Sequence, residues 1–255
     1  MSFKRRIYKT IERILAKYTD KIVCISEAEV SSALSSHIVP KEKLVLISNG
    51  INIEAVREAI PFRRSELQIP EEALVVGMVG RLTRQKAPDV FIKSAKLIME
   101  YIPNTYFIIV GEGEMKQEII EYAETNHIPL LVTGWIDDPY RYMKVFDIAM
   151  LLSRWEGFGL AIAEYMAAEK IIVATNVDAI PMVIENGKDG LLIASDHPEE
   201  AANKVRWIVE HPVESEIMKQ NAKKKVKDEY NVNRVAKQHV ELFRELLKAN
   251  EVCYE

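Results

Sequence analysis

The sequence lacks most of the features that would assign a chain of 255 residues to a specialised class of protein. Its two cysteines, Cys24 and Cys253, lie far apart and form no CxxC pair, which argues against a disulfide scaffold and a zinc ribbon. The five histidines are scattered and form no HxxxH pair. No apolar run approaches the roughly 20 residues that a membrane-spanning helix needs. The net charge of -4 argues against a dedicated nucleic-acid binder.

What the sequence contains is an ordinary globular composition, with 48% hydrophobic and 28% charged residues. This apolar content suffices for a core and excludes a wholly disordered chain. The first residues, MSFKRRIYK, are basic, but no apolar h-region follows them, so no secretory signal is predicted. We therefore expect a cytoplasmic protein with one large domain or two modest ones.

Residues 3–18 are predicted to form a basic amphipathic helix. Apolar residues recur at helical spacing from Phe3 to Tyr18, and lysines and arginines occupy the other face. We interpret this stretch as a packed helix with a solvated basic face, and the alternative is a helix lying on an anionic membrane surface. Short strands are predicted at 21–26 and 43–48, on either side of a helix that begins at Glu27.

From Leu74 onwards, apolar strand-like runs alternate with helical stretches. Alternation of this kind predicts an α/β fold with a doubly wound parallel sheet, and near-continuous apolar strands are typical of sheets covered on both faces. The predicted strands are 73–80, 105–111, 130–134, 147–153, 170–175 and 189–194. The helices predicted between and after them are 88–102, 115–126, 140–146, 159–169, 182–187 and 197–211.

These patterns divide the chain into four parts. Residues 1–60 supply too little sheet for an equivalent second domain, and the charged, proline-interrupted segment 61–72 is expected to be a linker. Residues 73–213 make a complete α/β domain, and residues 214–255 are expected to contain two charged C-terminal helices.

The loops at the carboxyl ends of the strands are the first places to look for a site, because open parallel sheets bind ligands there. The loop GRLTRQK (80–86) leaves its strand at Gly80 and carries two cations. Arg81 supplies a planar fork and Lys86 a point charge, a combination that suits a diphosphate. The alternative interpretation is a solvated basic loop.

Two further loops give weaker signals. GEGE (111–114) lacks the third glycine of a dinucleotide fingerprint, and no acidic residue is placed to hold a ribose, which argues against a dehydrogenase. GWIDDP (134–139) carries Trp135, a side chain that can lie beside a base or a sugar. From this loop alone, a buried structural tryptophan is the preferred interpretation.

The segment SRWEGFGLAIAEYMA (153–167) is the most informative. Glu156 precedes a predicted helix whose first turn carries Gly157 and Gly159, and free amides there suit phosphate or hydroxyl oxygens. At about 100° per residue, Glu156 and Glu164 would stand about 80° apart around the helix axis. The alternative is that Glu156 caps the helix and Glu164 is a surface residue. Glu164, however, lies among apolar residues and needs a partner.

Taken in order, these segments resemble the C-terminal donor-binding domain of retaining glycosyltransferases of family 4, which have the two-lobed GT-B fold. The resemblance implies a Rossmann-like donor-binding domain at 73–213, with residues 1–60 as a short remnant of the N-terminal acceptor lobe. The matching pieces are NGIN (49–52), GRLTRQK (80–86), IIVGEGE (108–114), VTGWIDD (132–138), SRWEGFGLAIAEYMA (153–167), VATNV (173–177) and ENGKDGLLI (185–193).

The resemblance also implies roles for single residues. Glu156, Arg81 and Lys86 would be the catalytic residues: the two cations neutralise the diphosphate, and Glu156 positions hydroxyls of the donor sugar. Glu164 would hold the ribose. The implied donor-binding residues are Gly80, Arg81, Lys86, Trp135, Ile136, Glu156, Gly157, Phe158, Gly159, Leu160 and Glu164. No metal ligand and no cofactor are expected, because in the family protein cations neutralise the diphosphate.

The function implied is retaining transfer of a hexosyl group from a nucleotide-diphosphate sugar to a saccharide or lipid-linked acceptor, in polysaccharide biosynthesis. Because most of the acceptor lobe is missing, this chain by itself is expected to bind nucleotide and to transfer sugar weakly or not at all. A partner chain would then supply the acceptor lobe, and no nucleic acid is expected as a partner. The basic helix leaves peripheral contact with the inner face of the membrane open.

Two alternative functions remain open. The chain can be a non-catalytic nucleotide-sugar-binding module that needs a partner subunit, or another GT-B enzyme such as an epimerase or a phosphorylase. Three departures from the family pattern concern the sugar pocket. Leu152-Ser153 replaces Pro-Ser, Glu164–Glu169 replaces Glu-Ala-Met-Ala-x-Gly, and Asp178–Met182 replaces Gly-Gly-x-x-Glu.

Overall fold

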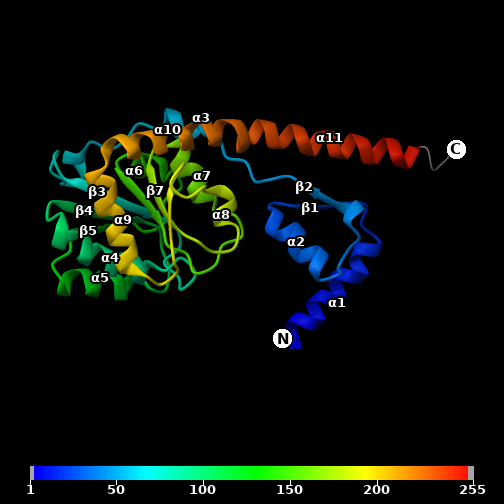
Figure 1. Cartoon of the computed structure of the whole chain (residues 1–255), viewed down its shortest axis with the longest axis horizontal. Helices are drawn as coiled ribbons and strands as arrows, with labels where there is room; N and C mark the ends of the chain where they lie inside the picture. The colour runs from blue at the N-terminus through cyan, green and yellow to red at the C-terminus, as the bar shows by residue number, and fades with distance from the viewer. Residues whose placement is uncertain (1–2, 252–255) are drawn as a thin grey trace. The chain divides into compact units, whose positions relative to one another are not determined.

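The computed structural model describes the backbone of residues 3–251 and the side chains of residues 7–248, so Cys253 lies outside the described residues. The chain separates into two compact units (Figure 1). One unit comprises the described parts of Met1–Gly50 and Glu229–Glu255, and the other comprises Ile51–Asp228. These limits differ from the expected boundaries at residues 60 and 213.

Specific contacts explain the difference. The Lys144 amine donates to the carbonyls of Arg57 and Ala59, at 2.6 and 2.7 Å, at the end of helix α3 (Ile53–Glu58). The expected linker contains the short 3-10 helix η2 (Arg64–Leu67), and Arg64 donates to both carboxylate oxygens of Asp147 at 3.0 and 2.9 Å. Segments 51–60 and 61–72 are therefore packed parts of the second unit.

The second unit is built on a six-stranded sheet in the order β5-β4-β3-β6-β7-β8. All its strand pairs are parallel, which confirms the doubly wound sheet predicted from the sequence. The strands are β3 (Leu74–Val79), β4 (Thr105–Val110), β5 (Leu130–Val132), β6 (Ile148–Leu151), β7 (Ile171–Thr175) and β8 (Leu191–Ile193). The strand order reverses between β3 and β6, so the crevice for a ligand is expected at their carboxyl ends.

Helices cover both faces of this sheet (Figure 1). They are α4 (Pro88–Tyr101), α5 (Lys116–Thr125), α6 (Tyr140–Met143), α7 (Leu160–Ala167), α8 (Ile180–Val183), α9 (Pro198–Glu210) and α10 (Pro212–Glu229). Helices α4, α5 and α9 share one buried cluster with alternate strand residues such as Val76 and Met78. On the other face, a Cβ on Gly77 would stand 2.3 Å from the Phe146 ring, so this strand position accepts only glycine.

The first unit has a smaller core. Strands β1 (Ile22–Cys24) and β2 (Leu44–Leu46) pair in parallel, as the predicted strands at 21–26 and 43–48 suggested. Helices α1 (Phe3–Lys17), α2 (Glu27–Ser35) and α11 (Val232–Glu251) and the short 3-10 helix η1 (Lys41–Lys43) accompany them. The buried cluster contains Ile47 after β2 and Val235 and Leu242 of α11.

The packing of helix α1 corrects the interpretation of its two faces. Lys9 donates to the Ser36 hydroxyl at 2.8 Å, and Arg13 donates to the Ser36 and His37 carbonyls at 2.6 and 3.0 Å. Cations are favoured there because the carboxyl end of α2 carries partial negative charge. Arg13 and Lys17 are exposed, and the apolar residues of this stretch are exposed as well, at 43–86% of their full exposure: Ile7, Tyr8, Ile11, Ile14, Leu15 and Tyr18. The side chains of residues 3–6 lie outside the described part.

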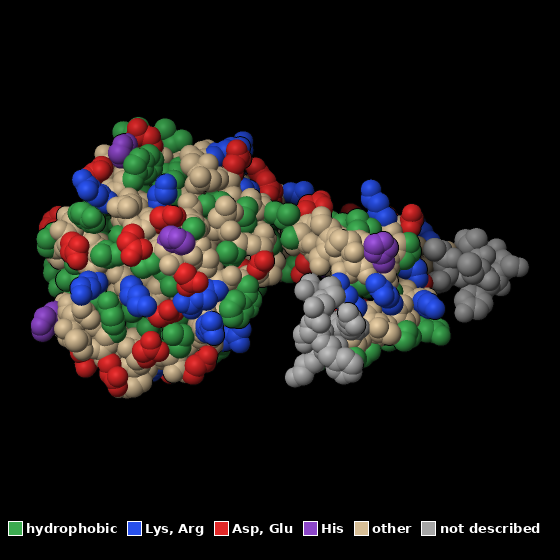
Figure 2. Space-filling model, turned by 60° about the horizontal axis from the view of Figure 1, so that its bottom comes forward, with side chains coloured by type: hydrophobic (Ala, Val, Ile, Leu, Met, Phe, Trp, Pro, Cys, Tyr) green, Lys and Arg blue, Asp and Glu red, His purple; other side chains and the backbone are tan. Residues whose placement is uncertain are grey.

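Two further observations bear on partners. Within the described residues, no helix is both long enough and apolar enough to cross a membrane. On the face drawn in Figure 2, acidic and basic side chains are interspersed over the α/β unit instead of forming a patch of one sign. A basic stripe is the usual electrostatic footprint of a nucleic-acid binder, and this face carries none.

Candidate functional site

The loop between β3 and α4 carries the two predicted cations. Arg81 is exposed, and its guanidinium lies 3.4 Å from the side-chain oxygen of Gln85. The Lys86 side chain is only 15% exposed and forms an ion pair with Glu156. Arg81 is thus available to a ligand, whereas Lys86 is already paired within the protein.

The glycines of the loop after β4 have a structural role. A Cβ on Gly111 would stand 2.0 Å from the Gly80 carbonyl oxygen, and one on Gly113 would stand 2.3 Å from that of Leu82. Backbone bonds also join the two loops, from Leu82 to the Glu112 carbonyl at 2.9 Å and from Met115 to the Leu82 carbonyl at 3.0 Å. The GxG pattern therefore marks a close approach of two backbones, and it holds the Arg81 loop in place.

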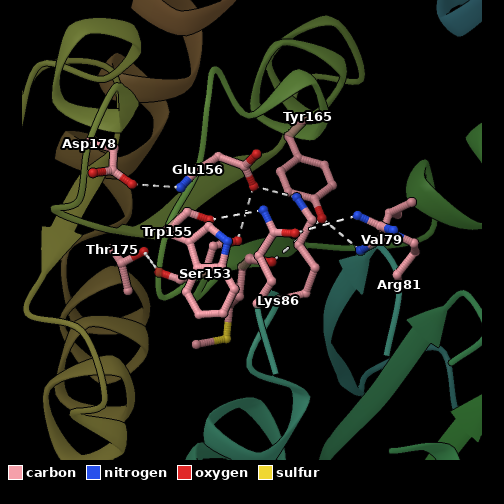
Figure 3. Close-up of polar contacts among 11 residues, drawn as sticks. Val79, Arg81, Lys86, Ser153, Trp155, Glu156, Tyr165, Thr175 and Asp178 are labelled. Atoms are coloured by element: carbon pink, nitrogen blue, oxygen red, sulfur yellow. Dashed lines mark hydrogen bonds and ion pairs between the residues drawn. The ribbon is translucent and has the colours of Figure 1, made fainter. Parts of the chain in front are cut away.

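Glu156 lies at the switch point, in the loop after β6 (Figure 3). Its carboxylate pairs with Lys86 and accepts a hydrogen bond from the Ser153 hydroxyl at 3.2 Å. Its backbone amide donates to the Asp178 carboxylate at 2.9 Å. The Glu156 side chain is only 11% exposed. A buried carboxylate with a cation and a hydroxyl as partners is held in one orientation.

The start of helix α7 corrects the predicted geometry around Glu156. The helix begins at Leu160 after Gly159, whose φ of 81° places it in the left-handed region that favours glycine. Glu156 precedes the helix, so the angle of about 80° for a continuous helix does not apply. Glu156 does not cap the helix either. A Cβ on Gly157 would meet no described atom within 4 Å, which leaves open space beside Glu156. Phe158 is buried and Leu160 is exposed.

Glu164 has the partner that its apolar surroundings require. The Tyr140 hydroxyl donates to its carboxylate at 3.2 Å. Burial raises the pKa of Glu164, and the hydrogen bond from Tyr140 offsets part of that rise. Burial and the nearby Glu164 charge raise the pKa of Tyr140 to about 12, so the phenol stays a donor at neutral pH. The interpretation of Glu164 as a surface residue is wrong.

Glu164→Gln is expected to become more stable relative to the wild type as the pH rises. A raised native pKa means that the folded protein keeps a proton that the unfolded chain loses above its ordinary value of 4.5. The free energy of unfolding of the wild type therefore falls as the pH rises from about 4.5 to the native pKa of Glu164. The neutral amide of the variant does not titrate and adds no such pH dependence. Urea unfolding from pH 4 to 8 measures this. A pH-independent difference between the two proteins would contradict the assignment.

The loop after β5 corrects the expectation for Trp135. Its side chain is 75% exposed, so the interpretation of a buried structural tryptophan is wrong. The indole N–H donates to Asp137 at 3.3 Å, and Ile136 is half-buried. Among the described residues, no hydrogen bond or ion pair joins Trp135 or Ile136 to the Lys86–Glu156 pair. An exposed aromatic ring in a loop at the ligand-binding edge of the sheet remains free to stack on a planar group.

The departures from the family pattern also have definite places. Leu152, which replaces the proline, is buried, and so is Ser153, whose carbonyl accepts from the Thr175 hydroxyl at 2.6 Å. Tyr165 is fully buried; its hydroxyl accepts from the Val79 amide at 2.7 Å and donates to the Met150 carbonyl at 3.5 Å. Asp178 has a φ of 44°, a left-handed conformation that favours glycine.

The geometry thus joins two parts of the predicted site. Lys86 and Glu156 meet directly, and Arg81 is linked to them through Gln85, whose side-chain amide donates to the Trp155 carbonyl at 3.1 Å. Tyr140 and Asp178 were missed by the sequence analysis, because no local pattern shows which side chain reaches Glu164 or the Glu156 amide. Among the described residues, no group of three His, Cys, Asp or Glu side chains is placed to hold a metal.

Comparison with known proteins places this arrangement in a family. The model for "Glycosyl transferases group 1" matches residues 59–225. The UDP-Gal:alpha-D-GlcNAc-diphosphoundecaprenol alpha-1,3-galactosyltransferase of Escherichia coli is 29% identical over 234 residues, which cover 89% of this chain and 60% of the relative. The poly(ribitol-phosphate) alpha-N-acetylglucosaminyltransferase of Staphylococcus aureus is 23% identical and is covered to 47%. The chain thus spans about half to three fifths of the length of these relatives.

Solved structures agree on the fold. Anabaena Alr3699/HepE in complex with UDP superposes with a TM-score of 0.82 at 20% identity, covering 93% of this chain and 68% of that one. Its complex with UDP-glucose gives a TM-score of 0.81. Since the family model matches more than half of the chain, and the parallel α/β unit has the Rossmann-like fold of GT-B enzymes, the protein belongs to the glycosyl transferases group 1 family.

Proposed function

We propose that this chain is the donor-binding part of a retaining glycosyltransferase of family 4. It would transfer a hexosyl group from a nucleotide-diphosphate sugar to a saccharide or lipid-linked acceptor. The observation that carries the proposal is the contact between Lys86 and Glu156 at the switch point of the sheet, with exposed Arg81 in the same loop as Lys86. Cations and a hydroxyl acceptor then meet where open α/β sheets bind ligands.

The arrangement suits departure of a diphosphate. Negative charge develops on the leaving group, and cations placed beside the leaving group stabilise that charge. Arg81 and Lys86 would supply these cations, and the amides at the start of α7 would add their partial positive charge. Glu156 would release Lys86 to the diphosphate and accept hydrogen bonds from sugar hydroxyls. The mechanism needs no metal and no cofactor.

The remaining residues would hold the nucleoside. The Glu164 carboxylate has one described donor, Tyr140, and a carboxylate has room for further donors such as ribose hydroxyls. Trp135 and Ile136 would border the base. UDP is the first nucleotide to test, because the Escherichia coli relative is named for UDP-Gal and Alr3699/HepE is described in complex with UDP. A lipid-linked acceptor would place the reaction at the cytoplasmic face of a membrane.

Arg81→Ala is expected to weaken binding of a nucleoside diphosphate by about 10- to 100-fold, the range for losing hydrogen bonds to a charged group. Arg81 is exposed, so its removal leaves the fold intact. Calorimetry with UDP, GDP, ADP and CMP measures the effect and identifies the base. Arg84→Ala, an exposed arginine in the same loop, is the matched control and is expected to bind as the wild type. Failure of every nucleotide to bind the folded chain would contradict the proposal.

A non-catalytic nucleotide-sugar-binding module is the second candidate. The observation that favours it is the use of the Glu156 amide by Asp178, which removes one donor from the crevice. Slow hydrolysis of the donor sugar separates the candidates, since a catalytic site cleaves UDP-glucose to UDP and glucose even without an acceptor. Binding with no cleavage over a day would favour the module.

We also propose that the first unit contacts a polypeptide that completes an acceptor lobe. A two-stranded parallel sheet is too small to stand alone, because parallel strands are normally covered on both faces. Helix α1 exposes an apolar stripe, which includes Ile11 and Leu15. The relatives are also longer than this chain. The partner would be either a separate chain or a further part of a longer protein.

Without that partner, the apolar stripe is expected to cause self-association. Sedimentation velocity between 5 and 100 µM, a range of about twentyfold, should show a concentration-dependent shift. Combined Ile11→Glu and Leu15→Glu substitutions should abolish it and leave nucleotide binding unchanged. Val213→Glu replaces an exposed apolar residue of α10 and serves as the control. A wild type that stays monomeric over the whole range would contradict the proposal.

A further inference from the structure

Arg154 joins three loops at the carboxyl edge of the sheet. It lies in the loop after β6, two residues before Glu156. Its guanidinium donates to both carboxylate oxygens of Asp89 in the first turn of α4, at 3.0 and 2.7 Å. It also donates to Asp196, after β8, at 2.7 Å and to the Arg84 carbonyl at 2.8 Å. One side chain therefore connects the loops that follow β3, β6 and β8.

The backbone strengthens this connection next to the ion pair. The Arg154 amide donates to the Gln85 carbonyl at 2.8 Å. The Gln85 side chain donates to the Trp155 carbonyl at 3.1 Å. Gln85 immediately precedes Lys86, and Trp155 immediately precedes Glu156. The two loops are thus tied at the residues on which Lys86 and Glu156 depend for their positions.

The Arg154–Asp89 pair is largely removed from water, with side-chain exposures of 17% and 18%. Burial alone raises the pKa of Asp89, but the hydrogen bonds and charge of Arg154 outweigh it, and the pKa lies below its ordinary value. Asp89 therefore stays ionised and the pair stays intact over the neutral range. Lysine cannot replace this arrangement, because the guanidinium offers several donors in a fixed plane and an ammonium group does not.

We infer that Arg154 is a positioning residue that sets the separation between Lys86 and Glu156, and with it the fit of a nucleotide-diphosphate sugar. The inference rests on the proposed function of that site. A diphosphate and the sugar attached to it have a fixed spacing, and displacements of about 1 Å at such sites can cost on the order of 100-fold in rate. Arg154 itself touches neither group, since its donors are directed at Asp89, Asp196 and Arg84.

The test compares Arg154→Lys with a matched arginine at the other end of the sheet. Arg64 also contacts both oxygens of a carboxylate, Asp147, through one terminal nitrogen, and its other terminal nitrogen donates to the Glu71 and Ala73 carbonyls, both at 2.6 Å. Its side chain is 20% exposed. Arg64→Lys thus disrupts four guanidinium hydrogen bonds, as many as Arg154 makes, next to the amino ends of β3 and β6 and far along the strands from Lys86 and Glu156.

Both variants are expected to unfold at lower urea concentration than the wild type. Only Arg154→Lys should also bind UDP-glucose more weakly, by about tenfold or more. The affinity of this variant for UDP-glucose should then be close to its affinity for UDP. Asp196→Asn removes the charge at the more exposed contact, where Asp196 is 54% exposed, and should give a smaller loss without a folding defect. Asparagine also tolerates the φ of 62° at that position.

Two failures are distinguishable. If the wild type binds neither UDP nor UDP-glucose, the proposed function fails. If the wild type binds both ligands and Arg154→Lys retains the wild-type ratio of the two affinities, the positioning role is wrong and Arg154 contributes to stability only. An equal loss in Arg64→Lys would lead to the same conclusion.

Discussion

Lys86→Met is expected to weaken binding of a nucleoside diphosphate by about 100-fold or more, a larger loss than that of Arg81→Ala. Removing the ammonium group deletes a charged contact, which accounts for about 10- to 100-fold. It also leaves the Glu156 carboxylate, only 11% exposed, without its cation. That negative charge then faces the incoming diphosphate and repels it. Calorimetry with UDP measures the loss.

A second substitution separates these two contributions. Combined Lys86→Met and Glu156→Gln lacks the cation and also the repelling carboxylate, so it should recover part of the affinity that Lys86→Met loses. The coupling between the two sites follows from the double-mutant cycle. Independent, additive effects would show that the Lys86–Glu156 contact does not govern access of the diphosphate. Thermal unfolding checks that each variant remains folded.

Glu156→Gln is expected to change the affinities for UDP and UDP-glucose in opposite directions. Lys86 is neutralised by Glu156, so a diphosphate must compete with this carboxylate for the ammonium group. The amide frees Lys86, and UDP should bind about 3- to 10-fold more tightly. The amide is also a weaker acceptor for sugar hydroxyls, because hydrogen bonds to charged groups are about twice as strong as neutral ones. UDP-glucose should therefore bind more weakly, and its cleavage should slow by about 100-fold or more.

Glu114→Gln provides the control for this change. Glu114 is an exposed carboxylate in the loop after β4, so the substitution removes the same charge without touching the ion pair. Its affinities for both ligands should stay within about twofold of the wild type, since exposed charges are screened by salt. Should Glu156→Gln weaken UDP and UDP-glucose equally, Glu156 would be acting on the nucleotide and the sugar contact would be refuted.

The fold was largely predictable because its signals are local. Buried parallel strands leave long apolar runs such as 105–111, and most helices between them show helical periodicity, so most limits agree within a few residues with the structure. The helix predicted at 182–187 is wrong in its limits, because the structure has α8 at Ile180–Val183. The placement of the Lys86 and Glu156 loops at one edge of the sheet followed from a general rule about carboxyl ends of strands, whereas the ion pair between the two side chains was not predicted. Both steps use sequence patterns that need no knowledge of loop conformation.

The features of the site that were not predicted depend on tertiary contacts. Tyr140 reaches Glu164 across 24 residues, and Arg154 reaches Asp89 across 65 residues, and no local pattern reports either contact. Glu156 was placed as though the helix began there, whereas Gly159 delays its start to Leu160. The spacing of residues 7–18 identified an apolar stripe, but periodicity cannot tell which face packs.

Tyr165 has a mechanical consequence for the crevice. Strand β3 pairs with β6 only at Val76 and Gly77, and further along it the Val79 amide donates to the Tyr165 hydroxyl. The Tyr165 side chain of α7 thus joins the helix to β3 at the point where β3 and β6 separate. Its hydroxyl accepts the hydrogen bond of the Val79 amide, which would otherwise be unpaired. Helix α7 cannot swing away from the sheet without exposing that amide. This hydrogen bond therefore opposes movement of α7 away from the sheet at this edge of the crevice.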